Sequence, residues 1–543
     1  MVFARRSTTL LAAIIASCAM VLSLTACTSD NKTVVDGQTT VTSNSAGGVA
    51  VFTPSDGITL NQQMPLNKWA KLVPDLTKAL VDAGFKKGDI NHTTSDSLDK
   101  QSRAIQDFVV DHLSNNTTDD SGIAIAPDNM TLLVAPVVEA DASTRQYGDY
   151  VSQNLSTNDA TDGEATSDGE SSEDDSSKDD SSNTESDSTA SDEQAQAVDR
   201  LVSSLKLAKE SGMHVVLLGN SIEGYKPDAF VKFSDAQTIG KLQAEKMVSK
   251  LKLDKASKDN PKYIEVLLPY TAVDEKGNAN DSTFAQEAFR GIWQVLGSYY
   301  QKGVVESPSG TLDGKSTEND WQAVAYDAAK EGSTAKVLDK RLAKTDGQST
   351  LTRIDGIITM NDYIASEVVK ELDDLGYTGS AADINPQITI SGIVGNITGK
   401  KDLSRDAVPD PIKSPENDNA NDSSSSDDDA DEDTSASDKD RDSQWPLVTG
   451  YGAYVSNIPS IVNGKQWMTG MEDRQTIATD IAQACAKLNK DEALNSMPSI
   501  RNSEVGGVKK IPTISEPLLA VSAGNLKSAL IDHGYISLAD AGL

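Results

Sequence analysis

Short apolar runs alternate with longer amphipathic stretches along most of this chain, starting near Val49. A buried strand reads as a continuous apolar run, whereas an amphipathic helix repeats its apolar residues about every three to four positions. The pattern predicts strands over residues 130–138, 214–218, 263–268, 354–360, 387–393 and 447–450. It predicts helices over residues 69–83, 99–113, 197–210, 236–251, 284–301, 321–331, 363–375 and 476–488. This alternation is typical of an α/β protein in which helices cover both faces of parallel sheets.

One junction in this pattern places polar side chains where a strand ends. Residues 353–377 read RIDGIITMNDYIASEVVKELDDLGY, an apolar strand followed by Asn361, Asp362 and a helix that ends at Gly376. In open α/β sheets ligands bind in the crevice outside the carboxyl ends of the strands, so this amide and this carboxylate are placed to contact a ligand. Asn and Asp are also favoured helix caps. The junction alone leaves a binding role and a capping role open.

The formal net charge of −33 is concentrated in two tracts of this 543-residue chain. Residues 156–193 and 414–442 are rich in Ser, Asp, Glu and Asn. Such a composition cannot bury an apolar core, so we expect two solvated, disordered insertions. Calcium loops are the alternative, but both tracts lack the ordered Gly and terminal Glu of an EF-hand. At 543 residues the chain is long enough for two or three domains.

The first residues have the features of a secretory signal. Arg5 and Arg6 precede an apolar run over residues 10–24, which is shorter than the roughly twenty residues of a membrane-spanning helix. The run ends in Leu-Thr-Ala-Cys, which resembles the lipobox of bacterial lipoproteins. That resemblance implies that Cys27 is lipidated and becomes the new amino terminus. We therefore expect a protein held on the extracytoplasmic face of the cell membrane by a lipid anchor.

The remaining Cys and His residues give no sign of catalysis. Cys18 lies in the removed signal, and Cys485 stands alone in a predicted helix, where a lone Cys is most often a small core residue. The four histidines are isolated and lack the His-x-x-x-His spacing of a zinc site. We expect neither a metal nor a cofactor. An extracytoplasmic glycosidase would need paired carboxylates, which the sequence cannot place.

Several segments, in order, resemble the type I periplasmic sugar-binding proteins of ABC importers, particularly the xylose and multiple-monosaccharide receptors. The resemblance runs from about Val49 to the end of the chain. The opening segment NKWAKLVPDLTKALVDAGF and the later Gln101 resemble the first strand-helix unit of that family. Further similar segments are HVVLLGNSIEG, DAFVKFSDAQTIGKLQAEKMV, STFAQEAFRGIWQVLGSYYQKG, WQAVAYDAAK, IDGIITMNDYIASEVVKELDDLGY, PLVTGYGAYVSNIPSIVNGKQWMTGMEDRQTIATDIAQA and IPTISEPLLAVSAGNLKSALIDHGY.

This resemblance implies two doubly wound α/β lobes joined by a hinge of crossing strands, with ligand held between them. We expect crossings near residues 231–235, near residues 468–470 and before the carboxyl-terminal tail. The resulting division is a signal peptide over 1–26, a tether over 27–48, a first lobe over 49–230 plus 470–510 and a second lobe over 231–469 plus 511–543. The disordered insertions are placed at residues 156–196 and 400–443.

The resemblance also implies which residues bind ligand. Asn361 matches the ligand-binding Asn of the family, and Asp362 matches its neighbour. Tyr451 and Trp69 are expected to stack on a sugar ring, although Trp69 fits equally well as a helix-core anchor. Asn220 and Glu472 are further polar candidates by family position.

Two departures affect the expected specificity. The family carries an Asp-Arg pair where this chain has Gly219 and Asn220, and an Asp where it has Gly452. Charged groups make the stronger hydrogen bonds to sugar hydroxyls, so monosaccharide specificity does not follow from the resemblance.

We therefore expect a monomeric, non-enzymatic solute-binding protein that delivers a small polar solute, a sugar, to an ABC permease. The alternative is a sensor or interaction lipoprotein on the same fold that has lost transport. A transcription regulator is disfavoured because no basic DNA-binding segment precedes the fold and the chain is exported, so we expect no nucleic-acid partner.

Overall fold

The computed structural model describes residues 46–55, 65–115, 125–138, 146–150, 153–156, 185–273, 280–343, 350–381 and 445–543. The signal, Cys27, the predicted strand 387–393 and the acidic tract 414–442 lie outside the described residues. In the part of the chain that is described, no helix is long and apolar enough to cross a membrane.

The first lobe is built on a seven-stranded sheet with the order β15-β16-β7-β5-β3-β1-β2. Its strands are β1 Gly48–Pro54, β2 Ile90–Ser95, β3 Met130–Val134, β5 His214–Leu218, β7 Ala229–Lys232, β15 Ile500–Val505 and β16 Val508–Ser515. Neighbouring strands are parallel except the hairpin of β15 and β16. The central strands β3 and β5 are buried almost throughout, which explains their continuous apolar sequences.

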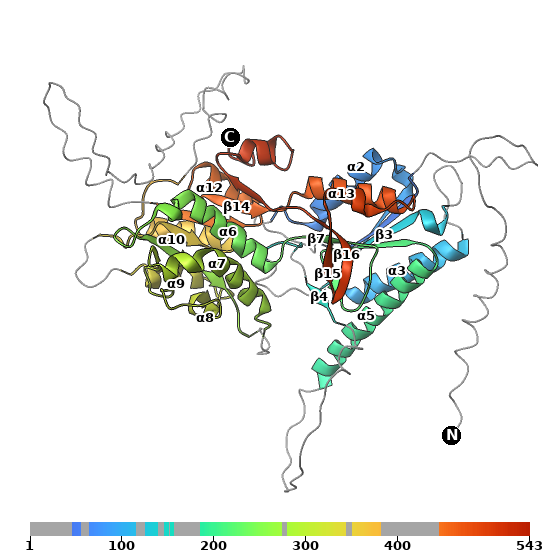
Figure 1. Ribbon diagram of the computed structural model, residues 1–543, viewed down its shortest axis with the longest axis horizontal. Coiled ribbons are helices and arrows are strands. Elements are labelled where there is room, and N and C mark those ends of the chain that lie inside the picture. The colour runs from blue at the N-terminus through green and yellow to red at the C-terminus, as the bar shows by residue number, and fades with distance from the viewer. Residues whose placement is uncertain are drawn as a thin grey trace, which may run out of the picture. The chain divides into compact units, whose positions relative to one another are not determined.

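The helices described over this sheet are α2 Trp69–Asp82, α3 Leu98–Asn115, α5 Glu185–Glu210 and α13 Arg474–Leu488. Leu76 of α2 and Ile481 of α13 belong to one apolar core, whereas Ile105 of α3 and Leu201 of α5 belong to another. Figure 1 shows the pairing of α3 with α5. The first lobe is thus a doubly wound sheet, as predicted.

The second lobe is built on a six-stranded sheet with the order β10-β8-β12-β13-β14-β17. Its strands are β8 Lys262–Val266, β10 Val305–Glu306, β12 Gly356–Ile358, β13 Leu447–Tyr451, β14 Met468–Met471 and β17 Leu519–Ser522. Its helices are α6 Ala236–Leu251, α7 Thr283–Gln301, α8 Trp321–Val324, α9 Ser333–Arg341, α10 Asp362–Asp374 and α12 Ile458–Val462. Only the β14–β17 pair is antiparallel among these described strands.

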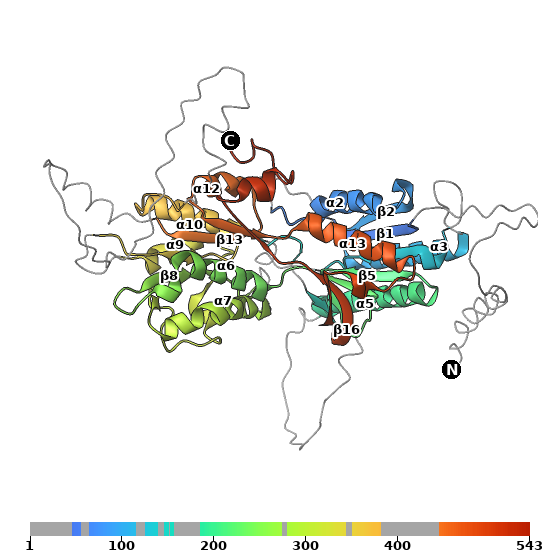
Figure 2. The same cartoon turned by 45° about the horizontal axis from the view of Figure 1, so that its top comes forward.

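Helices α6 and α7 lie side by side (Figure 2), and a glycine of each helix faces the backbone of the other. A Cβ atom at Gly240 would lie 2.2 Å from the carbonyl oxygen of Ala288. A Cβ atom at Gly291 would lie 2.0 Å from the carbonyl oxygen of Gln237. Any larger side chain at either position must push the two helices apart.

Within the described residues, three connections cross between the sheets: residues 233–235 after β7, residues 472–473 after β14, and residues 516–518 between β16 and β17. Our expected boundaries at 230/231, 469/470 and 510/511 each fall inside a strand. The third differs most, since β16 continues in the first sheet to Ser515. The hairpin with β15 extends this strand, and no local sequence signal marks its end.

Two predicted elements differ from the structure. The helix predicted over 321–331 is wrong, because α8 ends at Val324 and Ala325–Tyr326 form β11, which pairs with β9, Leu268–Pro269. Helix α5 begins at Glu185, within the range that we assigned to the first insertion. Strand pairing in the first case is a tertiary contact that helical periodicity does not report.

Candidate functional site

Asn361 has both a capping contact and a contact with Gln146, which lies between β3 and β4, Asn154–Leu155, in the chain. It is the N-cap of α10, and its side-chain oxygen accepts a hydrogen bond from the Ile364 backbone N–H at 2.9 Å. Its side-chain nitrogen donates to Oε1 of Gln146 at 3.1 Å. Met360, just before it, has a left-handed φ of 69°, a backbone strain typical of functional sites. The capping role is therefore present, and the amide N–H still points away from its own helix.

The side-chain hydrogen bonds of Asp362 are made to residues of its own lobe, the second. The side chain is fully buried and accepts hydrogen bonds from Gln466 Nε2 at 2.7 Å, Thr469 Oγ1 at 2.8 Å and the Tyr454 backbone N–H at 2.9 Å. Burial raises the pKa of this carboxyl to about 6, and the three donors partly oppose that shift. These contacts tie α10 to β14 and to the loop after β13.

A second cluster joins two of the crossings. Ser234 on the first crossing donates from its backbone N–H to Glu472 on the second at 2.6 Å, and its hydroxyl donates to the same oxygen at 2.5 Å. The hydroxyl of Tyr451 lies 2.5 Å from Ser234 Oγ and 3.4 Å from the Glu472 carboxyl. We call Ser234, Tyr451 and Glu472 the hinge cluster. Burial raises the pKa of Glu472 to about 7 and raises that of Tyr451.

Trp69 begins α2 and lies inside the first lobe. Its ring is only 3% exposed and packs edge-on against Tyr150 at 5.1 Å and Phe233 at 5.7 Å. Its backbone N–H donates to the Asp149 carboxylate at 3.1 Å. Trp69 thus lies in the core of the first lobe, with Tyr150 of the later chain as one of its ring neighbours.

Asn220 and Gln101 hold the two ends of a loop. Asn220 donates to the Pro136 carbonyl at 2.9 Å and accepts from the Gln153 backbone N–H at 2.9 Å. Gln101 donates to the Ala135 carbonyl at 2.8 Å and accepts from the Val137 backbone N–H at 2.9 Å. Each of these side chains is nearly or fully buried. They fix the points where the chain leaves β3 and where it returns before β4, Asn154–Leu155.

The chain between these points includes residues 146–150, Gln-Tyr-Gly-Asp-Tyr, which we call the bridging segment. Tyr147 packs in the core of the second lobe, 4.7 Å from the ring of Phe284 and 6.4 Å from that of Tyr451. Tyr150 packs in the core of the first lobe, 4.8 Å from the ring of Phe233. One five-residue segment therefore contacts both lobes.

The polar contacts of the bridging segment are also made with both lobes, Gln146 with the second and Asp149 with the first. The Tyr454 hydroxyl of the second lobe donates to the Gln146 carbonyl at 2.7 Å. Asp149 forms an ion pair with Lys68 of the first lobe at 2.8 Å, and its backbone N–H donates to the Asn67 carbonyl at 2.8 Å. Sequence reasoning missed this segment, although two tyrosines around a glycine, just before an acidic tract, are a usable signal.

The structure thus brings Asn361, Tyr451 and Trp69 to one segment, whereas Asn220 holds that segment's stem. Glu472 belongs to the hinge cluster, and Asp362 to the interior of the second lobe. No group of three or more His, Cys, Asp or Glu residues suited to a metal ion occurs among the described residues. Cys485 is fully buried in α13, as predicted, and burial raises the pKa of its thiol.

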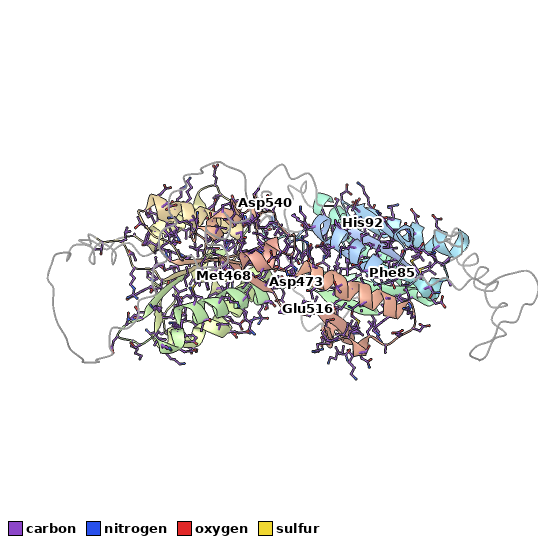
Figure 3. The ribbon with its side chains drawn as sticks, turned by 90° about the horizontal axis from the view of Figure 1, so that it is seen from above. Phe85, His92, Met468, Asp473, Glu516 and Asp540 are labelled. Atoms are coloured by element: carbon purple, nitrogen blue, oxygen red, sulfur yellow. The ribbon has the colours of Figure 1, made fainter. Side chains whose placement is uncertain are left out.

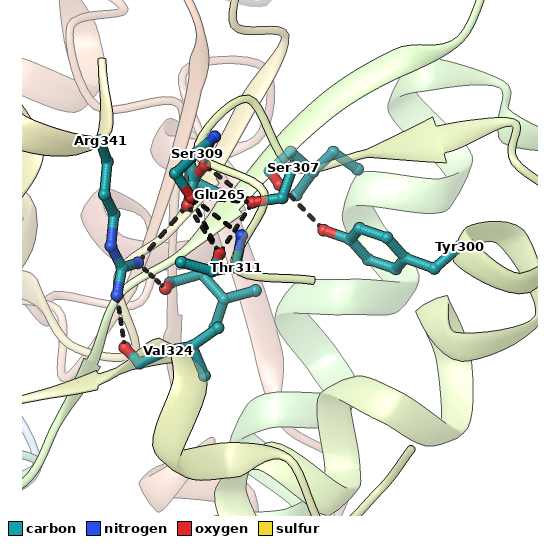
Figure 4. Close-up of polar contacts among 9 residues, drawn as sticks. Glu265, Tyr300, Ser307, Ser309, Thr311, Val324 and Arg341 are labelled. Carbon is teal, nitrogen blue, oxygen red and sulfur yellow. Dashed lines mark hydrogen bonds and ion pairs between the residues drawn. The ribbon is translucent and has the colours of Figure 1, made fainter. Parts of the chain in front are cut away.

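Two further polar clusters lie elsewhere. Glu265 on β8 is fully buried, accepts from Ser307 Oγ and the Ser309 backbone N–H at 2.8 Å each, and pairs with Arg341 at 3.5 Å (Figure 4). Arg341 also donates to the Val324 carbonyl at 2.9 Å. This cluster joins α9 and the loop after β10 to the sheet.

The second cluster is acidic and lies at the crossings. Asp473 caps α13 and accepts from the Tyr535 hydroxyl at 2.9 Å, and Glu516 lies on the third crossing (Figure 3). Burial raises the pKa of Glu516 and of Asp480, which share a hydrogen bond.

Comparisons with known proteins give structural similarity only: no family model and no curated protein matches the sequence. An ABC transporter solute-binding protein from Clostridium phytofermentans, with bound β-D-glucose, is 17% identical over 91% of this chain and 99% of that chain, with a TM-score of 0.44. A carbohydrate transporter solute-binding protein from Chloroflexus aurantiacus, in complex with D-glucose, is 18% identical over 91% and 98%, with a TM-score of 0.42. At these values no ligand or activity is carried over to this chain.

Proposed function

We propose that this protein is a solute receptor that binds a small polar solute, a sugar, between its two lobes and passes it to an ABC permease. The observation that carries the proposal is the amide of Asn361. It stands at the carboxyl end of β12, where ligands bind in open α/β sheets, and its N–H leaves its own lobe to bond Gln146. The aromatic residues Tyr451 and Trp69 contact the same segment as Asn361, through Tyr147 and Tyr150.

The binding mode follows from this placement. A solute that contacts Asn361 on one side and first-lobe groups on the other stabilises only the arrangement in which both lobes meet, which is a population shift set by differential affinity. No nucleophile or metal enters the scheme, so the solute is bound and released unchanged.

The receptor is further proposed to be lipid-anchored at Cys27 on the extracytoplasmic face of the membrane, and to act as a monomer. Cys27→Ser tests the anchor. The full chain is expected in the membrane fraction, and the variant in the soluble fraction. A Cys27→Ser protein that stays with the membrane contradicts the anchor.

A second function is favoured by one specific observation. The amides of Asn361 and Asn220 already have partners within the chain, namely Gln146, Pro136 and Gln153. If these amides keep their partners within the chain, they are not free to bind a solute. The protein would then serve as a surface sensor or interaction lipoprotein without transport.

Thermal melting of the full chain distinguishes these functions. Pentoses, hexoses, disaccharides, polyols, nucleosides and amino acids are screened. A ligand at a hundred times its dissociation constant adds about 2.7 kcal/mol of stability and raises the melting temperature. A rise with one sugar class that is lost in Asn361→Ala, but kept in the exposed control Asn319→Ala, supports the receptor. No rise with any compound supports the sensor.

A further inference from the structure

We infer that the bridging segment, residues 146–150, is an internal occupant of the solute site, so that a solute binds only by displacing it. The inference rests on the proposed function, because it takes Asn361, Tyr451 and Trp69 as the solute-contacting residues. Each of these three residues touches the bridging segment: Asn361 through Gln146, Tyr451 through Tyr147, and Trp69 through Tyr150 and Asp149.

The segment offers the chemistry that a bound sugar would offer. The side-chain oxygen of Gln146 accepts the Asn361 N–H as a sugar hydroxyl would, and the ring of Tyr150 packs edge-on against that of Trp69. The contacts also span both lobes, with Tyr147 in the core of the second and Tyr150 in the core of the first. A ligand between two lobes has to make both sets of contacts at once. The segment therefore holds the two lobes together without solute.

The docking depends on a backbone feature that only glycine provides. Gly148 has a left-handed φ of 95°, and a Cβ atom there would lie 2.6 Å from the carbonyl oxygen and 2.8 Å from the Cβ atom of Asn67. Both the conformation and the space exclude a side chain. An alanine at position 148 is therefore expected to displace the bridging segment from Asn67, just before α2. The substitution leaves the other residues of both lobes as they are in the native chain.

Displacing the bridging segment should change the affinity of the protein for a solute by a predictable factor. When only a fraction of molecules has an open site, the apparent dissociation constant equals the intrinsic one divided by that fraction. Gly148→Ala, which raises the open fraction, is expected to tighten sugar binding by about ten- to a hundredfold. Gly224→Ala is the matched control, because Gly224 also has a left-handed φ, of 68°, but no neighbouring atom within 4 Å.

The experiment measures binding of D-glucose, D-xylose and D-ribose to the full chain and both variants by calorimetry. Tighter binding in Gly148→Ala alone supports the inference, as does binding seen only in that variant. Equal or weaker binding than in the native chain overturns it while the receptor function stands. No binding by any of the proteins overturns both.

A second variant tests the same inference if Gly148→Ala fails to fold. Gln146→Ala removes only the acceptor for Asn361 and leaves the backbone unchanged. One lost hydrogen bond of about 1 kcal/mol predicts about fivefold tighter sugar binding. Gln301→Ala, at the exposed end of α7, is its control and is expected to bind as the native chain does. Unchanged affinity in a folded Gln146→Ala protein contradicts the inference.

Discussion

The side-chain amide of Asn361 donates a hydrogen bond to the side-chain oxygen of Gln146, 215 positions earlier in the chain. This bond joins the start of α10 in the second lobe to the bridging segment that leaves the first. The same Asn361 side chain caps α10 through its oxygen. Its two ends therefore have separable roles, one in helix stability and one between the lobes.

Substitutions at Asn361 are expected to separate those roles. Ser is as good an N-cap as Asn but is too short to reach Gln146, whereas Ala provides neither contact. Asn361→Ala should lower the free energy of unfolding by about 1 kcal/mol more than Asn361→Ser, because only Ala removes the cap. Both variants should lose solute binding. Urea unfolding and thermal shift measure the two effects, and retained binding in a stable Asn361→Ser protein would contradict the assignment.

Glu472 in the hinge cluster is expected to make stability depend on pH. Burial raises its pKa from an ordinary 4.5 to about 7, so the folded chain holds a proton that the unfolded chain has already released. Stability contributed by this group is present below pH 4.5 and is lost as the pH rises to about 7, on the order of 3 kcal/mol in all.

Glu472→Gln tests this expectation. Gln cannot ionise and keeps an acceptor for Ser234, so the variant should match the native chain at low pH and exceed its stability above pH 7. Glu492→Gln is the control, because Lys487 lowers the pKa of that exposed carboxyl and its removal cannot give the same sign. Parallel stability profiles for Glu472→Gln and the native chain from pH 4.5 to 7 would rule out the assignment.

Removing only the cation of the Glu265–Arg341 ion pair should lower the free energy of unfolding strongly. Arg341→Met leaves Glu265 fully buried without its cation, which typically costs about 3–5 kcal/mol. Adding Glu265→Gln should restore much of that loss, because the remaining group is then neutral. Lys78→Met, in an exposed pair with Asp82, should change stability by about 0.5 kcal/mol or less. If urea unfolding gives equal losses of unfolding free energy for Arg341→Met and Lys78→Met, the buried ion pair contributes no more to stability than the exposed one.

Gly291 should be the most sensitive position of the α6–α7 contact. Gly291→Ala places a methyl group on the carbonyl of Gln237, and such overpacking typically costs about 1–3 kcal/mol. Ser298→Ala, on the exposed side of the same helix, should be neutral or slightly stabilising because Ala is the better helix former. Thermal unfolding measures both, and a neutral Gly291→Ala would mean that the helices separate at little cost.

The sequence by itself determined the α/β class, most helices that cover the two sheets, and five of their described strands, namely β3, β5, β8, β12 and β13. Apolar runs and helical periodicity are local properties, so they remain visible without the fold. It did not give β11 in place of a longer helix, or the end of β16, because each depends on pairing with a distant strand.

Only the tertiary structure decided what the candidate site residues contact. The sequence placed Asn361, Tyr451 and Trp69 at strand ends or helix starts, and the fold then brought Gln146, Tyr147 and Tyr150 to them. No periodicity links positions so far apart, because a contact between two lobes depends on the path of the whole chain rather than on local conformational preference.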